Sequence, residues 1–315
     1  MQGAARVALV GCGNIGSRLL QSAARMGAER IDVVEPSRRA REIALARHAE
    51  AAPDARAPRF VERAEQLEGP YDLGIVATDA RNRLGATRAL LAAAEHRAVL
   101  LEKVLFTRND EFDAALDLAC AHGTPFAVNC SRNEWPGYLA LTRRTLDEGL
   151  EALDVEGADW SMGCNAIHFL ALAERLAGTP VARVEWEGPA RTREAKRTGY
   201  AEVTGTLRAS LGDGSRVRLS SAAQGGGPLS VTVRTTRARY TIDEANGTIA
   251  RGRAAPEPFL TLRASELDRA FARLVGGASA LPSLDESART HRALFEALNE
   301  AFHGERTLAV ECPVT

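Results

Sequence analysis

The chain has 315 residues, enough for two domains of ordinary size that each bury a core. Its 40 lysines and arginines balance 41 aspartates and glutamates, so a net charge of −1 creates no basic field for nucleic acid or an anionic membrane. No apolar run approaches the roughly 20 residues needed to span a bilayer, and we recognise no export signal. Composition therefore favours a soluble globular protein with a small-molecule partner.

From residue 5 to about residue 128, short apolar runs alternate with segments of helical length. Helices are predicted over 15–26, 38–50, 82–95 and 111–121, and strands in "RVALVG", "IDVVE", "RFVE", "YDLGIVAT", "AVLLEK" and "PFAVNC". This alternation implies right-handed βαβ crossovers and a parallel sheet covered on both faces. We therefore expect a doubly wound α/β domain over residues 1–128.

After about residue 150 the pattern changes to strands that look antiparallel. The runs are "ARVEWEG", "AEVTGTLRASL", "SRVRLSSA", "LSVTVRT" and "ARYTIDEANGTIARG", with hairpin turns in "LGDGS" and "EANGT". Two helices are predicted, one over 165–177 and one over 283–303. Residues 129–315 are thus expected to form an α+β domain on an open, mostly antiparallel sheet.

A glycine-rich run, "GCGNIG", lies between the first predicted strand and the first predicted helix. Its three glycines have the G-x-G-x-x-G offsets, which permit a tight turn and close approach of the backbone to a pyrophosphate at a helix N-terminus. Glu35 follows the last glycine by nineteen residues and ends the second strand, where a carboxylate can bind ribose hydroxyls. The residues expected to hold a dinucleotide are Gly11, Gly13, Asn14, Ile15, Gly16 and Glu35. A simple strand-to-helix turn with a surface glutamate is the alternative.

The residues after Glu35 bear on the choice of cofactor. Ser37, Arg38 and Arg39 follow at once and could bind a 2′-phosphate, so NADP stays open. A carboxylate beside that phosphate would repel it, which favours NAD.

Two further strands end in polar residues at the same edge of the predicted sheet. Thr78 and Asp79 follow the fourth strand, and Glu102 and Lys103 follow the fifth. Doubly wound folds bind ligands at the carboxyl ends of their strands. Lys103 could donate to a substrate oxygen or to the nicotinamide ribose; an ordinary surface lysine is the alternative.

The motifs "GCGNIG", "IVAT", "EKV" and "GCNAIHFLAL", in this order, resemble the Gfo/Idh/MocA family of sugar and cyclitol oxidoreductases over nearly the whole chain. The resemblance implies an N-terminal Rossmann domain that binds NAD or NADP, with Thr78, Glu102 and Lys103 beside the cofactor. It also implies a C-terminal open-sheet domain for substrate binding and homo-oligomer contacts. By position, Lys103 and His168 are the residues that handle the hydroxyl proton during hydride transfer, from a cleft between the domains.

Two residues depart from the family pattern. Val104 stands where the family has a proline after the lysine. A cis peptide bond before a residue other than proline costs roughly 3 kcal/mol, so a cis bond is less expected at Lys103–Val104 than at a Lys-Pro bond. Cys164 replaces the carboxylate four residues before His168, so the acid–base machinery is altered or supplied from elsewhere. For His168 the alternative is a partly buried helix histidine with structural hydrogen bonds, and for Cys164 a small core residue.

A narrower resemblance rests on "LLEKVLFTR", "VNCSRNEWPGY", "GADWSMGCNAIHFL" and "AKRTGYAEVTGTL". These segments resemble a bacterial subgroup associated with surface-polysaccharide and nonulosonic or nucleotide-sugar biosynthesis, which shares the cysteine-for-aspartate change. It implies that the substrate is contacted by Arg132, Cys164, Asn165, His168, Lys196 and Arg197. For the three basic residues among them, an ordinary solvated surface charge is the alternative. Trp135, Tyr138 and Trp160 are expected to stack on a sugar ring or to pack in the core.

The cysteines and histidines indicate a reducing compartment and no metal. Five cysteines, an odd number, are scattered without C-x-x-C pairs, and no histidine lies at metal spacing from another ligand type. We expect a cytoplasmic protein whose thiols are mostly buried and free. The cysteines are Cys12, Cys120, Cys130, Cys164 and Cys312.

The sequence thus predicts an NAD(P)-dependent oxidoreductase that moves a hydride between nicotinamide and a secondary alcohol or ketone. Its substrate is a sugar or a sugar derivative, with nucleotide-linked and acidic sugars included, and it is expected to form a homo-oligomer through the C-terminal sheet. Two alternatives remain open. One is an NAD-retaining epimerase or lyase with transient oxidation, and the other is a non-catalytic dinucleotide-binding sensor or scaffold.

Overall fold

The computed structural model describes residues 5–225 and 227–315, which divide into two compact units. The described part of the first unit comprises residues 5–106, 110–134 and 262–285, and that of the second 107–109, 135–225, 227–261 and 286–315. The predicted boundary assigns everything from residue 129 onward to a second domain. In the structure, residues 129–134 and 262–285 pack with the first unit instead.

The first unit is built on a six-stranded, wholly parallel sheet in the order β3-β2-β1-β4-β5-β6. The strands are β1 (Arg6–Val10), β2 (Arg30–Val34), β3 (Arg59–Val61), β4 (Tyr71–Val76), β5 (His96–Leu101) and β6 (Phe126–Val128). The order reverses direction between β1 and β4, and open α/β sheets bind their ligands outside the carboxyl ends of the strands at such a point. The predicted doubly wound sheet is confirmed.

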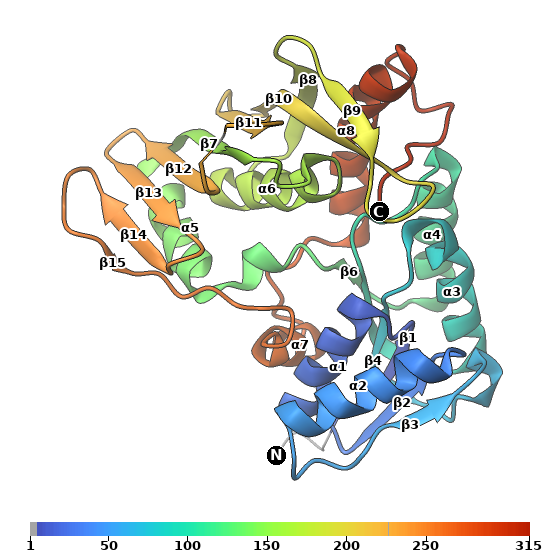
Figure 1. Ribbon diagram of the computed structural model, residues 1–315. Helices are drawn as coiled ribbons and strands as arrows, with labels where there is room; N and C mark the ends of the chain where they lie inside the picture. Colours follow the sequence, from blue (N-terminus) through green and yellow to red (C-terminus); the bar gives the residue numbers. More distant parts are fainter. Residues whose placement is uncertain (1–4, 226) are drawn as a thin grey trace. The chain divides into compact units, whose positions relative to one another are not determined.

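Helices cover both faces of this sheet. They are α1 (Asn14–Arg25), α2 (Arg38–Ala51), α3 (Ala80–Ala93), α4 (Asn109–His122) and α7 (Asp268–Val275), with short 3-10 turns η1 (Ala64–Gln66) and η2 (Ser131–Glu134). Figure 1 shows α1 and α2 along one face and α3 and α4 on the other. The chain adds strands in one direction from β1 to β3 and in the opposite direction from β4 to β6, so right-handed connections place the two pairs of helices on opposite faces.

Helix α7 belongs to the first unit because a buried carboxylate and an apolar contact hold it there. Glu134 is fully buried, pairs with Arg273 of α7, and accepts hydrogen bonds from Ser279 Oγ (3.0 Å) and the Ala280 N–H (2.6 Å). Phe271 lies in the same core cluster as the strands of the parallel sheet. These long-range contacts cannot be inferred from local sequence patterns.

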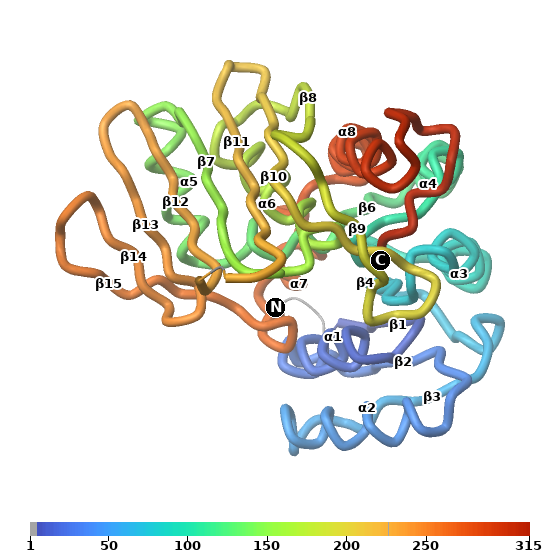
Figure 2. The backbone as a smooth tube through the Cα atoms, turned by 45° about the horizontal axis from the view of Figure 1, so that its top comes forward, coloured from blue at the N-terminus to red at the C-terminus, as the bar shows by residue number. Residues whose placement is uncertain are grey.

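The second unit is built on a nine-stranded, mostly antiparallel sheet in the order β15-β14-β13-β12-β7-β11-β10-β8, with β9 paired to β10 (Figure 2). Its strands are β7 (Leu150–Ala158), β8 (Val181–Trp186), β9 (Arg191–Glu194), β10 (Ala201–Leu211), β11 (Arg216–Ala222), β12 (Ser230–Thr235), β13 (Arg239–Asp243), β14 (Thr248–Arg251) and β15 (Glu257–Pro258). Both predicted hairpins form, β10 with β11 and β13 with β14. The β7–β11 pair is parallel.

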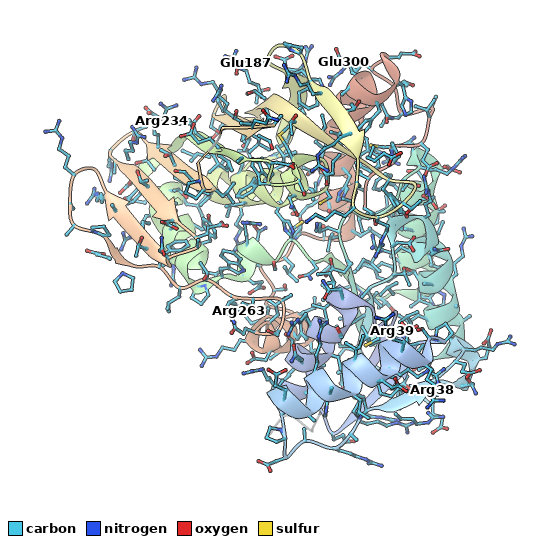
Figure 3. All side chains as sticks on the ribbon, in the orientation of Figure 1. Arg38, Arg39, Glu187, Arg234, Arg263 and Glu300 are labelled. Carbon is cyan, nitrogen blue, oxygen red and sulfur yellow. The ribbon has the colours of Figure 1, made fainter. Side chains whose placement is uncertain are left out.

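Helices α5 (Pro136–Glu148), α6 (Met162–Ala177) and α8 (Leu284–His303) complete the second unit. Helix α6 packs on β7, β8, β10 and β11, and its apolar residues are almost wholly buried. Charged side chains are also exposed on this sheet unit, among them Arg234 of β12 and the partly exposed Glu187 just after β8, both labelled in Figure 3. Within the described parts of the chain, no helix is both long and apolar enough to cross a membrane.

Candidate functional site

The glycine-rich loop joins β1 to α1, as predicted. Gly11 has a φ of +85°, and a Cβ built on it would lie 3.0 Å from the backbone nitrogen of Thr78. A Cβ on Gly16 would lie 2.1 Å from the carbonyl oxygen of Gly11. Both glycines are therefore required by the close packing of the loop itself.

Gly13 is different, because the fold does not require a glycine there. Its φ is −67°, an ordinary value, and a Cβ on it would meet no atom within 4 Å. Gly13, Asn14 and Ile15 are exposed, and the first turn of α1 has neither an acidic residue nor a side-chain cap. Open space thus lies over a helix N-terminus, where unsatisfied N–H groups and the helix dipole favour an anion.

Glu35 is anchored beside this loop by two backbone hydrogen bonds. Its side chain is buried (9% exposed), with Oε2 accepting from the Cys12 N–H (2.8 Å) and Oε1 from the Ser37 N–H (2.9 Å). Burial, aided by the Glu35 charge, raises the pKa of Cys12 to about 12, so its thiol is neutral. The Glu35 carboxylate is therefore held beside the glycine-rich loop by backbone donors.

Several arginines surround the same loop. Arg38 and Arg39 are exposed at the start of α2 (Figure 3), and Arg38 pairs with Glu42 of its own helix at 2.9 Å. Arg47 reaches back from α2 to the first turn of α1, where its Nη1 donates to the Asn14 carbonyl oxygen at 3.2 Å and to Ser17 Oγ. Our sequence reasoning missed Arg47, since nothing local distinguishes it from a solvated helix residue.

The loop after β4 contributes Thr78 and Asp79. Thr78 Oγ1 is buried and has no hydrogen-bond partner in the described part of the chain. Asp79 caps α3 by accepting from the Asn82 N–H at 3.2 Å, so its carboxylate has a structural task. Because an unpaired buried hydroxyl is costly, Thr78 fits a ligand that would supply the missing partner.

The loop after β5 carries Glu102 and Lys103. Glu102 is buried, accepts from Asn129 Nδ2 and from the Lys103 N–H (3.2 Å), and burial raises the pKa of its carboxyl. Lys103 itself is half-buried. The Lys103–Val104 peptide bond is cis, although valine in place of proline made a cis bond less expected here than at Lys-Pro.

Arg83 of α3 joins these two loops and was not predicted. Its side chain is 2% exposed, and its guanidinium donates to the carbonyl oxygens of Thr78, Val104 and Leu105. A signal was present, because Arg83 occupies the apolar face of its helix, in line with Thr87 and Leu90. An arginine on the apolar face of a helix indicates a buried guanidinium that needs polar partners.

In the second unit, helix α6 carries Cys164, Asn165 and His168. Cys164 is half-buried with Sγ 3.5 Å from the Ser161 carbonyl oxygen, and Asn165 Nδ2 donates to the Trp160 carbonyl oxygen at 3.0 Å. His168 is 9% exposed and, four residues after Cys164, shares its face of the helix. The helix begins at Met162, three residues before the predicted start.

A carboxylate lies at the start of α6 although position 164 holds none. Glu202 of β10 is 5% exposed, and its Oε2 accepts from the Gly163 N–H at 2.9 Å. It satisfies one of the first-turn N–H groups in place of a side-chain cap on Ser161. Sequence periodicity could not find Glu202, because β10 and α6 meet only in the folded unit.

The remaining substrate candidates are dispersed. Lys196 and Arg197 are exposed in the loop between β9 and β10, and Arg132 is half-buried in η2 of the first unit. Tyr138 is fully buried and donates to Glu244 at 2.6 Å, so it packs in the core. Trp160 packs on Phe169 and donates to the Ser220 carbonyl oxygen.

The described residues hold no group of three His, Cys, Asp or Glu side chains arranged for a metal ion. All five cysteines are free. Three are buried, Cys120 is exposed and Cys164 is half-buried.

No protein-family model and no curated protein matches this sequence. Solved structures do match the fold over almost the full chain. UDP-N-acetylglucosamine 3-dehydrogenase from Acidithiobacillus ferrooxidans superposes with a TM-score of 0.70 at 17% identity, covering 93% of this chain and 96% of that one. Our chain shares that fold.

Two other neighbours were solved with a dinucleotide. Scyllo-inositol dehydrogenase from Lactobacillus casei, with bound NAD(H) and scyllo-inositol, has a TM-score of 0.68 at 12% identity, covering 96% of this chain and 97% of that one. An oxidoreductase from Agrobacterium radiobacter, in complex with NAD+, L-tartaric acid and magnesium, has a TM-score of 0.70 at 14% identity with the same coverage. The predicted two-part fold is thus confirmed.

Proposed function

We propose that this chain is an NAD-dependent dehydrogenase of the Gfo/Idh/MocA type that acts on a secondary alcohol or ketone of a sugar-like substrate. The observation that carries the proposal is the pairing of an open helix N-terminus at Gly13 with the anchored carboxylate of Glu35. Neighbours of the same fold crystallised with NAD support it.

The residues present fit a dinucleotide. Gly13, Asn14 and Ile15 would hold the pyrophosphate, Glu35 the adenosine ribose, and Thr78, Glu102 and Lys103 the nicotinamide side. Bound NAD supplies the hydride acceptor. Glu35 favours NAD over NADP because its negative charge would repel a 2′-phosphate.

Side chains of this protein would stabilise the reacting oxygen and transfer the hydroxyl proton. Lys103 would stabilise the oxygen of the reacting hydroxyl with its ammonium group, and His168 would take the hydroxyl proton, since a histidine can do so near neutral pH. Cys164, Asn165, Arg132, Lys196 and Arg197 are the proposed substrate contacts. Position 164 holds a thiol where the family pattern has a carboxylate, so the acid–base chemistry proposed for His168 does not rely on an acidic side chain four residues before it.

Lysine usage gives independent support for Lys103. The chain has 40 basic residues, and Lys103 and Lys196 are the two lysines among them. Arginine has therefore replaced lysine almost everywhere that a positive charge suffices. Lysine differs from arginine in carrying its charge on one compact ammonium group, which suits the stabilisation of a single reacting oxygen.

The test is a screen of the purified chain with NAD and NADP in parallel, read by absorbance of the reduced nicotinamide. Scyllo-inositol, myo-inositol, UDP-N-acetylglucosamine and its acidic sugar derivatives are the first compounds to try. Lys103→Arg keeps the charge and should abolish turnover while NAD still binds, and Arg88→Lys, at an exposed position of α3, is the matched control. Full activity of Lys103→Arg would refute the assignment of Lys103.

The same experiment separates the alternatives. Protein that carries stoichiometric NAD and converts substrate without net NADH formation is an epimerase or a lyase. Binding of NAD without turnover of any compound favours a sensor or scaffold. Turnover of a nucleotide-linked or acidic sugar would support the narrower subgroup associated with surface polysaccharides.

We also propose a cytoplasmic homo-oligomer assembled through the exposed face of the second sheet. Arg208 and Arg218 lie opposite each other on β10 and β11 and both pair with Glu187, and Arg234 pairs with Asp154 at 3.3 Å. A face with both signs of charge can match a second copy of itself. Arg218→Glu should shift the mass measured by light scattering towards the monomer, and an unchanged mass would refute this interface.

A further inference from the structure

The buried guanidinium of Arg83 has no role in the proposed chemistry, yet the structure places it between the two loops that carry that chemistry. Nη1 donates to the carbonyl oxygens of Val104 and Leu105, the latter at 2.9 Å, and Nη2 donates to the carbonyl oxygen of Thr78. The first two acceptors follow β5 and the third follows β4, neighbouring strands of the parallel sheet. All of these residues belong to the first unit.

Burying this charge is costly, so a packing role alone does not explain it. The side chain is 2% exposed on a helix face whose other members are alanine, leucine and threonine. An apolar residue would fill this space without desolvating a cation. A planar fork of N–H donors can instead bind several carbonyl oxygens at fixed angles, which a single ammonium group does poorly.

Glu102, whose charge interacts with that of Arg83, also belongs to the site. The positive charges of Lys103 and Arg83 both favour the ionised form of Glu102, which is itself buried and bonded to the Lys103 N–H. Arg83 thus binds the backbone carbonyl of Val104, the residue after Lys103, and its charge stabilises the carboxylate of Glu102, the residue before Lys103.

We propose that Arg83 is a positioning residue that fixes the backbone of Lys103 and of Thr78 relative to each other. It would set the point from which the Lys103 ammonium reaches the reacting oxygen, without contacting substrate or cofactor. This inference rests on the proposed function, but its geometric part can be tested without a substrate.

The variants are Arg83→Met, which keeps the length and removes the donors, and Arg83→Lys, which keeps the charge. Arg88→Met, an exposed arginine of the same helix, is the control. Because a displacement of about 1 Å can cost about 100-fold in rate, we expect Arg83→Met to lower kcat by about that factor with little change in KM. Arg83→Lys should recover part of the loss, and Arg88→Met should match wild type.

A second readout does not depend on turnover. Trinitrobenzenesulfonate labels lysines, and the labelling rate of Lys103 can be measured by peptide mass spectrometry with Lys196 as an internal reference. We expect Arg83→Met to change the Lys103 to Lys196 ratio and to raise hydrogen exchange in residues 77–79 and 103–106. Arg88→Met should change neither.

The outcomes separate the two proposals. If wild type oxidises none of the compounds but Arg83→Met alters Lys103 labelling and loop exchange, the proposed reaction fails and the positioning role stands. If Arg83→Met keeps wild-type labelling and exchange, or if kcat per folded molecule is unchanged, Arg83 only supports the fold and the inference is overturned. Arg83→Lys provides the same comparison should the methionine variant not fold.

Discussion

Replacing Gly13 with alanine is the most direct test of the dinucleotide site. The added methyl group meets no atom within 4 Å, and the backbone at Gly13 already has a negative φ. The free energy of unfolding should therefore change by no more than about 0.5 kcal/mol. The same methyl group would occupy the space over the α1 N-terminus and push a phosphate away from the backbone N–H groups. Hydrogen bonds to a charged group contribute about 1.5–3 kcal/mol, so NAD affinity should fall about 10- to 100-fold.

Gly16→Ala is the matched comparison. Its Cβ would lie 2.1 Å from the Gly11 carbonyl oxygen, a backbone atom that cannot move freely. Overpacking of this kind costs about 1–3 kcal/mol, so this variant should lose both stability and NAD binding. Urea unfolding and titration calorimetry with NAD measure the two quantities separately. Wild-type NAD affinity in Gly13→Ala would show that no phosphate approaches this residue.

Three further predictions follow from buried groups. Glu35→Ala should weaken NAD binding by about tenfold or more and NADP binding less, and equal losses in calorimetry would contradict a ribose contact. Burial lowers the pKa of His96 from 6.5 to about 4. As pH falls from 6.5 towards 4, the imidazole is protonated in the unfolded chain but not in the folded one, so the free energy of unfolding decreases. His96→Phe should then remove up to about 3 kcal/mol of this pH dependence in unfolding experiments. Burial instead raises the pKa of Glu102, so its contribution to stability is lost as pH rises above its unfolded value. Glu102→Gln should therefore gain stability relative to wild type as pH rises above the unfolded value of Glu102, and a difference that does not change with pH would contradict this reasoning.

Local patterns predicted most of the first unit. Its strands are short apolar runs such as Leu73–Val76, which are buried on both faces of a parallel sheet and so differ clearly from the amphipathic helices between them. The glycine loop follows β1 and Glu35 follows β2, as the sequence predicted, since both depend on chain positions at the ends of adjacent strands. Their hydrogen bond through Cys12 follows from that adjacency.

Patterns were weaker in the second unit. Strand β7 lies in the middle of the sheet but was not predicted, because "LEALDVEGA" mixes acidic residues with apolar ones and its parallel partner β11 is more than 50 residues away. Helix α5 was also not predicted, although the proline at its first residue is compatible with the first turn of a helix.

The sequence by itself determined the parallel sheet, the glycine loop, Glu35 and the place of Lys103 after the fifth strand. Each depends on residues close together in the chain, whose spacing is set by the periods of strands and helices. Only the tertiary structure decided that Gly13 faces open space, that Arg83 joins two loops, and that Glu134 returns α7 to the first unit. These features depend on side chains brought together by packing between distant segments, and local propensity carries no information about such contacts.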